Sequence, residues 1–204
     1  MPLNENFLIF PDMPYSEMVF VKGNKQLQDF YIGKYLVTQV LWKRVMGEEA
    51  NNSCFKGDNR PIEAVSWNEI TQKFFPQFNV FTKEIYGLPT ESTWEFAAKG
   101  GLLSKEYKYA GSNDLDEVGW YKKNSHDESK PVGLKAPNEL GLYDMSGNIF
   151  EWIQNRAENS ASKIIRGGGW YHYDYSCAST YSDDYDPDNM SSGVGFRLFL
   201  MRLI

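Results

Sequence analysis

The sequence is poor in the residues that build common catalytic and metal centres. Its 204 residues include only two cysteines and two histidines. Cys54 and Cys177 are too few for a disulfide scaffold, and nothing in the sequence requires them to pair. With only His126 and His172, a histidine-rich iron or zinc site is not expected. Gly-x-Ser-x-Gly, His-Glu-x-x-His, Cys-x-x-Cys and phosphate-loop motifs are missing as well.

Long apolar runs and basic runs are also missing. No stretch is apolar enough for a transmembrane helix, and the first ten residues do not resemble a signal peptide. We therefore expect no membrane insertion and a cytoplasmic protein, or a protein of the virion surface if a phage encodes it. The 21 basic residues are outnumbered by 27 acidic ones, giving a formal net charge of -6. Nucleic acid is therefore not an expected partner.

Aromatic side chains, by contrast, are abundant. They make up 16% of the chain, with 13 Tyr, 13 Phe and 6 Trp. The length and an apolar fraction of 42% suit one folded domain with a substantial core. Some of the rings must fill that core, and the others must lie on the surface, where large aromatic groups usually serve binding.

Regular structure is predicted mainly in the first half of the chain. Stretches rich in β-forming residues are 18–21, 30–32, 164–166 and 196–201. Helical stretches are 39–46, a second from residue 66 towards 86–87, and 91–99. Thr38 and Ser66 are N-caps, and Pro76 is expected to kink or split the second helix. We expect one α+β domain over residues 1–204, with few helices, short strands and much irregular loop.

Five short motifs follow one another between residues 66 and 197. They are Ser66-Trp67, Leu88-Pro89-Thr90-Glu91 with Trp94-Glu95-Phe96-Ala97-Ala98, Gly141-Leu142-Tyr143-Asp144-Met145-Ser146-Gly147-Asn148 with Glu151-Trp152, Arg166-Gly167-Gly168 with Trp170, and Gly195-Phe196-Arg197. Together they resemble the formylglycine-generating-enzyme (sulfatase-modifying-factor) family, and the resemblance that they carry covers residues 18 to 200. That resemblance implies a C-type-lectin-like fold. Glu95, Glu151, Arg166 and Arg197 are expected to form buried ion pairs that order a loop-rich fold.

The catalytic pattern of that family is incomplete in this sequence. The founding enzymes oxidise a substrate cysteine with a copper ion held by two cysteines, and the matching positions here are His172 and Cys177. With one thiolate missing, we expect no copper and no catalysis, and we interpret Cys177 as a small buried residue. A formylglycine-generating-type oxidase stays as the alternative function.

With copper not expected, calcium is the cofactor that the resemblance leaves possible for this chain. Asp144, Gly147, Ile149 and Glu151 fall where the family can bind calcium through carboxylate and backbone oxygens. The alternative is that Asp144 caps a turn and that Glu151 pairs with an arginine. The sequence leaves both open.

Residues 171–186 have a composition that neither a core segment nor a linker would have. They contain five Tyr, four Asp and three Ser, and no Leu, Ile, Val, Phe, Lys or Arg. Tyrosine supplies rigid contact area and Ser and Asp supply adaptable polar contacts, as in antibody-like binding surfaces. Residues 166–198 are therefore interpreted as a variable ligand-binding region.

This region also resembles the variable regions of diversity-generating retroelement proteins. Those retroelements mutate adenines, often in Asn codons, which yields Tyr, His, Asp, Ser or Gly. The candidate ligand-binding residues are Tyr171, His172, Tyr173, Asp174, Tyr175, Ser176, Tyr181, Asp183, Asp184, Tyr185, Asp186, Ser191, Ser192 and Gly193. Their expected partner is a protein or cell-surface ligand. The alternatives are a solvated loop of an ordinary family member and a structural part of a larger assembly.

Overall fold

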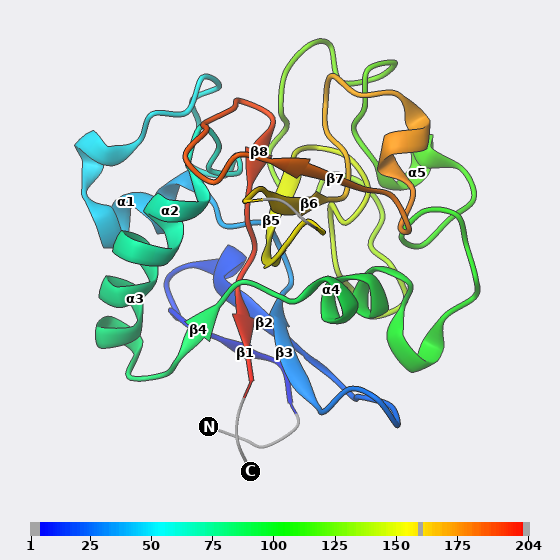
Figure 1. Cartoon of the computed structure of the whole chain (residues 1–204), viewed down its shortest axis with the longest axis horizontal. Helices are drawn as coiled ribbons and strands as arrows, with labels where there is room; N and C mark the ends of the chain where they lie inside the picture. The colour runs from blue at the N-terminus through cyan, green and yellow to red at the C-terminus, as the bar shows by residue number, and fades with distance from the viewer. Residues whose placement is uncertain (1–4, 159–160, 202–204) are drawn as a thin grey trace.

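Two small sheets and a few short helices form the molecule, as Figure 1 shows for the computed structural model, which describes residues 5–158 and 161–201. The first sheet has the strand order β1-β2-β3-β9-β4. Its strands are β1 (Phe7–Leu8), β2 (Glu17–Val21), β3 (Phe30–Gly33), β4 (Tyr86–Gly87) and β9 (Phe199–Leu200). Every pairing in it is antiparallel. The last strand thus lies between β3 and β4 and ties the end of the chain to its beginning.

The second sheet has the order β7-β6-β5-β8 and carries the residues of functional interest. Its strands are β5 (Phe150–Arg156), β6 (Lys163–Arg166), β7 (Ser182–Tyr185) and β8 (Val194–Gly195). Strand β7 consists of Ser-Asp-Asp-Tyr, residues of mostly low strand propensity, and it forms because all four pair with β6. Both β5 and β7 were missed in the sequence; for β7 the reason is its composition, since Ser-Asp-Asp-Tyr becomes a strand only through its pairing with β6.

The helices are short and their boundaries follow local signals. They are α1 (Gln39–Met46), α2 (Trp67–Glu69), α3 (Phe75–Thr82), α4 (Glu91–Ala98) and α5 (Leu115–Val118), with a π-helical turn η3 (Ile70–Phe74) and 3-10 turns η1 (Pro14–Ser16), η2 (Glu48–Ala50), η4 (Gly101–Leu103) and η5 (Asp174–Cys177). The predicted cap is present, since Ser66 Oγ accepts a bond from Glu69 N at 3.0 Å. Pro76 lies in the first turn of α3, after the π turn, so the predicted interruption is confirmed. That helix ends at Thr82, earlier than expected.

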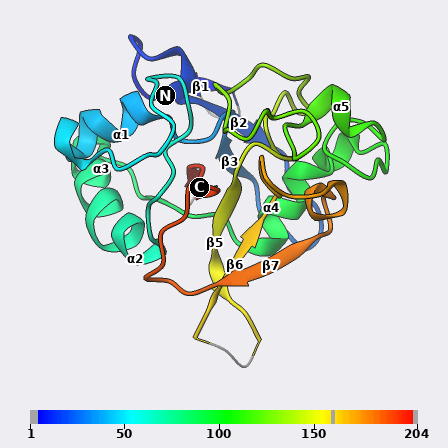
Figure 2. The same ribbon diagram turned by 90° about the horizontal axis from the view of Figure 1, so that it is seen from above.

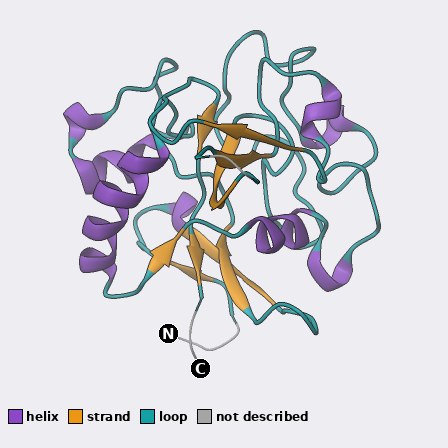
Figure 3. Cartoon of the chain, in the orientation of Figure 1, coloured by secondary structure: helices purple, strands orange, loops and turns teal. Residues whose placement is uncertain are grey.

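Viewed from above, α1 to α3 lie on one side of the β5–β6 hairpin and α4 and α5 on the other (Figure 2). Much of the chain between α5 and β5 is loop (Figure 3). The α+β architecture with few helices, short strands and long irregular stretches is as predicted. No helix within residues 5–158 and 161–201 is long and apolar enough to cross a membrane.

Stacked aromatic rings fill the core beneath the second sheet. Trp42 and Phe74 are parallel with centroids 5.2 Å apart, and Phe196 meets Phe74 edge-on at 5.1 Å. Trp152 of β5 is fully buried, and its Nε1 donates to the Val65 carbonyl at 3.0 Å. This packed layer gives the second sheet a rigid base.

Candidate binding surface at residues 171–186

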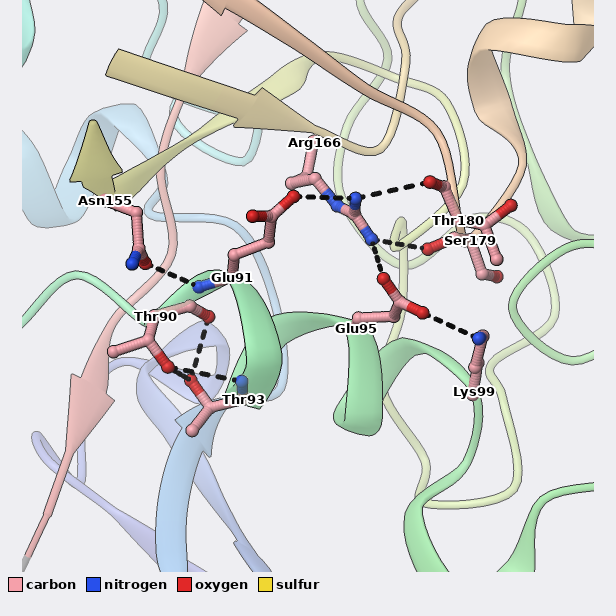
Figure 4. A network of polar contacts seen from close by, with 9 residues as sticks. All are labelled: Thr90, Glu91, Thr93, Glu95, Lys99, Asn155, Arg166, Ser179 and Thr180. Carbon is pink, nitrogen blue, oxygen red and sulfur yellow. Dashed lines mark hydrogen bonds and ion pairs between the residues drawn. The ribbon is translucent and has the colours of Figure 1, made fainter. Parts of the chain in front are cut away.

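A buried arginine joins β6 and α4 to residues 171–186, hereafter called the segment. Arg166, at the end of β6, is 1% exposed. Its guanidinium donates to Glu91 Oε1 at 3.1 Å and to Glu95 Oε2 at 2.6 Å, both on α4. It also donates to the main-chain carbonyls of Ser179 and Thr180, at 2.8 and 3.3 Å (Figure 4). Arg166 therefore holds the segment by its backbone, whatever side chains the segment carries.

Helix α4 carries the two carboxylates that bind Arg166. Its first turn is capped, and Lys99 is a second cation beside Glu95. The side chain of Thr90 caps the helix, and Asn155 Oδ1 accepts the Glu91 N–H at 2.8 Å (Figure 4). Burial by itself would raise the pKa of Glu95, but hydrogen bonds from Lys99 and Arg166 hold that pKa below its ordinary value. The carboxylate thus stays charged opposite Arg166, and the predicted involvement of Glu95 and Arg166 in an ion pair is confirmed.

Further contacts hold residues 170–193 through main-chain atoms. They are Ser125 Oγ to Trp170 O at 2.7 Å, Lys122 N to His172 O at 3.0 Å, Ser179 N to Lys108 O at 3.0 Å, Asn68 N to Pro187 O at 3.2 Å and Phe150 N to Gly193 O at 2.8 Å. None of these bonds involves a side chain of the segment. Changes of side chain at its exposed positions therefore leave the anchoring intact.

The exposed side chains of the segment are three tyrosines, four aspartates, Thr180 and Ser182. Tyr171, Tyr173 and Tyr175 are 39%, 56% and 58% exposed. Asp174, Asp183, Asp184 and Asp186 are exposed as well. Their exposure agrees with the expectation of a displayed surface. Ligand binding by these residues stays a prediction.

The expectation of exposure is wrong for two candidates and too simple for others. Ser176, in the turn η5, is 3% exposed, and Gly193 is buried beneath the Tyr171 ring. Tyr181 and Tyr185 are half-buried because they pack against the main hydrophobic core. His172, Ser191 and Ser192 are also only partly exposed. Composition marks the segment, but only the packing decides which of its side chains face the solvent.

Aromatic rings of the segment form a continuous row with rings of the scaffold. From one end, the row is Phe55, Trp170, Tyr171, His172, Phe150, Tyr181, Tyr175 and Tyr173, with centroids of neighbours 3.9 to 6.5 Å apart. At its far end, Lys122 Nζ lies 4.6 Å from the centre of the Tyr173 ring. Burial lowers the pKa of His172. His172 is thus a neutral member of this row at neutral pH.

A cavity of about 520 Å³ opens beside the exposed tyrosines. Tyr173 and Asp174 form one wall and α5 forms another. Its lining residues are Tyr109, Asn113, Asp114, Leu115, Asp116, Tyr121, Lys122, Lys123, Tyr173 and Asp174. Most of them precede residue 166, so the cavity joins an earlier part of the chain to the segment. Sequence reasoning missed this wall, because the earlier residues lie more than 40 positions before the segment.

Cys177 has the surroundings of an inert core residue. The side chain is fully buried, and burial raises the pKa of its thiol to about 12. Its Sγ lies 3.9 Å from the Tyr173 carbonyl, to which it donates a weak bond. Cys54 is exposed, and neither cysteine is part of a disulfide. At neutral pH Cys177 is therefore a thiol and not the thiolate that binds metals.

One of the four candidate calcium ligands, Glu151, forms a buried ion pair with Arg197. Both carboxylate oxygens of Glu151 accept bonds from Arg197, at 2.7 and 2.8 Å, and Trp94 Nε1 adds a bond at 2.9 Å. Asp144 Oδ2 accepts the Gly133 N–H at 2.8 Å, and burial raises the pKa of Asp144 to about 6.

Glu151 in this arrangement fits the arginine alternative and offers calcium no free carboxylate. Gly147 and Ile149 lie between the two acids on the chain, and Ile149 is fully buried. The described ranges also contain no group of three or more His, Cys, Asp or Glu side chains that could hold a metal. Calcium binding stays a prediction, now one in which the ion must compete with Arg197 for Glu151.

Comparison with known proteins gives three related findings. The family described as the sulfatase-modifying factor enzyme 1-like domain matches residues 14–201. Chaperone protein LppX of Paenibacillus barcinonensis is 33% identical over 90% of this chain and 84% of its own length. The formylglycine-generating enzyme of Streptomyces coelicolor is 28% identical over 76% of this chain, but the match covers only 57% of that enzyme.

Among solved structures, Treponema denticola variable protein 1 superposes with a TM-score of 0.83. The match covers 98% of this chain and 99% of that one, at 23% sequence identity. The two proteins therefore share a fold over almost their entire lengths.

Proposed function

The chain belongs to the sulfatase-modifying factor enzyme 1-like family, and we propose that it is a binding protein of this family without catalytic activity. Its ligand is a protein or cell-surface molecule, and residues 171–186 present the side chains that select it. The single observation that carries the proposal is the way the segment is held. Arg166 and the scaffold bind its main chain, while Tyr171, Tyr173 and Tyr175 face the solvent.

Two similarities support this function. Treponema denticola variable protein 1 has the same fold, and its name describes a protein that varies. Residues 171–193 of this chain have the composition expected of adenine mutagenesis. LppX is named a chaperone protein, which describes a binding function and not a reaction. The arrangement here supports a surface whose exposed residues can change while its backbone stays in place.

The oxidase alternative needs two thiolates, and this chain offers one buried thiol. His172 occupies the first position and lies between the rings of Phe150, which it meets edge-on, and Tyr171. We therefore expect no oxidation of cysteine-containing peptides by the purified protein, with or without Cu(I). Turnover that depends on Cys177 and is lost in Cys177→Ala would contradict this part of the proposal.

Binding is tested by a pull-down from host-cell extracts and surface fractions, followed by affinity measurement with the recovered partner. Tyr173→Ser and Tyr175→Ser should each weaken binding by about 2 kcal/mol or more, since a few aromatic anchors carry most interface energy. Phe81→Ser is the matched control, because Phe81 on α3 is 59% exposed and lies outside the segment. Equal affinities for all three variants would show that the partner binds elsewhere.

A further inference from the structure

The charged side chains between Trp170 and Arg197 all have one sign. Between Trp170 and Arg197 the chain contains five aspartates and no lysine or arginine. The two arginines that flank this stretch, Arg166 and Arg197, are buried in ion pairs and do not reach the surface. His172 adds no charge at neutral pH, because burial lowers its pKa.

Most of these aspartates have no cationic neighbour within the described ranges. Asp174 lies 3.6 Å from Lys108. Asp183, Asp184, Asp186 and Asp188 are exposed, and within the described ranges they take part in no ion pair. Four like charges so close in sequence repel one another, and a cationic partner would relieve that repulsion.

Strand β7 carries Asp183 and Asp184 along a free sheet edge, and Asp186 and Asp188 follow the strand. It is the outermost strand of the order β7-β6-β5-β8, and Figure 2 shows it along the outside of the molecule. Asp183 Oδ1 accepts the N–H of Asp184 at 2.9 Å, so that donor is not available to an added strand. The loss of this donor makes extension of the sheet along β7 less favourable than recognition through side chains.

The exposed rings beside β7 suit the same kind of partner. Tyrosine faces attract ammonium and guanidinium groups, and Lys122 over Tyr173 is an example within the chain itself. The cavity next to Tyr173 does not share the charge of β7, since Asp114, Asp116 and Asp174 in its lining face Lys122 and Lys123. The preference for cations therefore belongs to β7 and to the exposed ring of Tyr175, because Lys122 already lies over the Tyr173 ring.

We propose, on the basis of the binding function above, that the partner is a protein surface or segment rich in lysine and arginine. Its cations lie along Asp183, Asp184 and Asp186, and its neighbouring side chains cover Tyr173 and Tyr175. Long-range attraction of this kind acts mainly on the rate of association and weakens with salt.

The test uses a random peptide library displayed on phage, selected against the full chain at low and at physiological salt. Selected peptides are measured against wild type, Asp183→Asn with Asp184→Asn, and the control Glu5→Gln with Glu49→Gln, which removes two exposed charges elsewhere. We expect enrichment of Lys and Arg, weaker binding at higher salt, and association about tenfold slower for the double Asn variant only, within the range of electrostatic steering.

Two results would overturn the inference, and they separate it from the binding function. One is the selection of neutral or acidic peptides that bind wild type but not the double variant Tyr173→Ser with Tyr175→Ser. That result would support the binding function and would contradict a cationic partner. Selected peptides whose binding ignores both the tyrosine and the aspartate changes would reject the binding surface itself, and the inference with it.

Discussion

At the scale of single residues, Gly193 and Tyr171 depend on each other although 22 positions separate them. A Cβ on Gly193 would lie 2.1 Å from a carbon of the Tyr171 ring. Gly193 has no unusual backbone angle, so the ring is what excludes a side chain there. Both residues are candidates for variation, and the structure predicts that they cannot vary independently.

Gly193→Ala should therefore destabilise the wild type by about 1–3 kcal/mol, the usual cost of overpacking, or push the Tyr171 ring aside. In the Tyr171→Ser background the same change should cost much less. Urea unfolding of the two single variants and the double variant gives the coupling energy directly. Equal costs of Gly193→Ala in both backgrounds would show that the ring does not restrict this position.

Glu63 is a second residue whose surroundings predict a measurable effect. Its side chain is fully buried beneath the loop that carries Phe55, and Oε1 accepts the Phe55 N–H at 3.0 Å. Burial raises its pKa from 4.5 to about 6. The folded state therefore binds a proton more tightly than the unfolded state does.

The contribution of Glu63 to stability should be largest below about pH 4.5 and should be lost as the pH rises through 6. Relative to Glu63→Gln, wild type should gain about 2 kcal/mol on acidification across this range, at about 1.4 kcal/mol per pKa unit. Urea unfolding at several pH values measures the difference. Parallel curves for the two proteins would contradict a shifted pKa.

At the scale of elements, the sequence predicted those that depend on local signals. Helix α1 has the predicted bounds, and the Ser66 cap and the Pro76 interruption are present. Strands β5 and β7 were missed; β7 has a composition of low strand propensity and forms through its pairing with β6. The clamp formed by Arg166, which joins β6 to two glutamates of α4 and to two carbonyls of the segment, was not predicted either. The motifs indicated an ion pair for Arg166, but nothing local points to the carbonyls of Ser179 and Thr180.

Arg166→Met tests this clamp. The change leaves Glu91, Glu95 and two carbonyls without their donor, so we expect a loss of about 2–4 kcal/mol, less than for a fully buried pair because each carboxylate is about one third exposed. Hydrogen exchange should speed up most in residues 178–185. Glu91→Gln, which keeps a hydrogen-bond acceptor, should have a smaller effect. Unchanged exchange in that segment would mean that Arg166 does not position it.

At the scale of the whole molecule, calcium would act on stability as a ligand of the folded state. A ligand that binds only the folded chain raises its melting temperature, and a chelator reverses this. If calcium binds here, it has to displace Arg197 from both oxygens of Glu151, and the melting temperature should then be lower in excess EGTA than in calcium. An unchanged melting temperature would reject the site. A lower melting temperature in EGTA, together with bound calcium by elemental analysis, would establish the predicted site at Asp144, Gly147, Ile149 and Glu151.

The fold and the location of the surface were thus predictable, while the details of the site were not. Five ordered motifs were enough for the fold, and composition was enough to locate the segment. The burial of Ser176 and Gly193 depends on contacts between distant parts of the chain. The same is true of the cavity wall that contains Tyr109 and Tyr121. Such contacts leave no periodic or compositional sign in a single sequence.

The central claim is that the scaffold holds this segment by its backbone and leaves its side chains free to change. The most direct measurement is thermal unfolding of a variant with five exposed side chains replaced together, Tyr171, Tyr173, Tyr175, Asp183 and Asp184 each by Ser. Exposed positions usually change stability by less than about 0.5 kcal/mol each, so this variant should melt as one cooperative unit within a few degrees of wild type. Its comparison is Trp170→Ser, which removes the scaffold ring beneath the segment and should lower the melting temperature by far more. Loss of cooperative unfolding in the five-residue variant would contradict the claim, because those side chains would then be part of what holds the fold together.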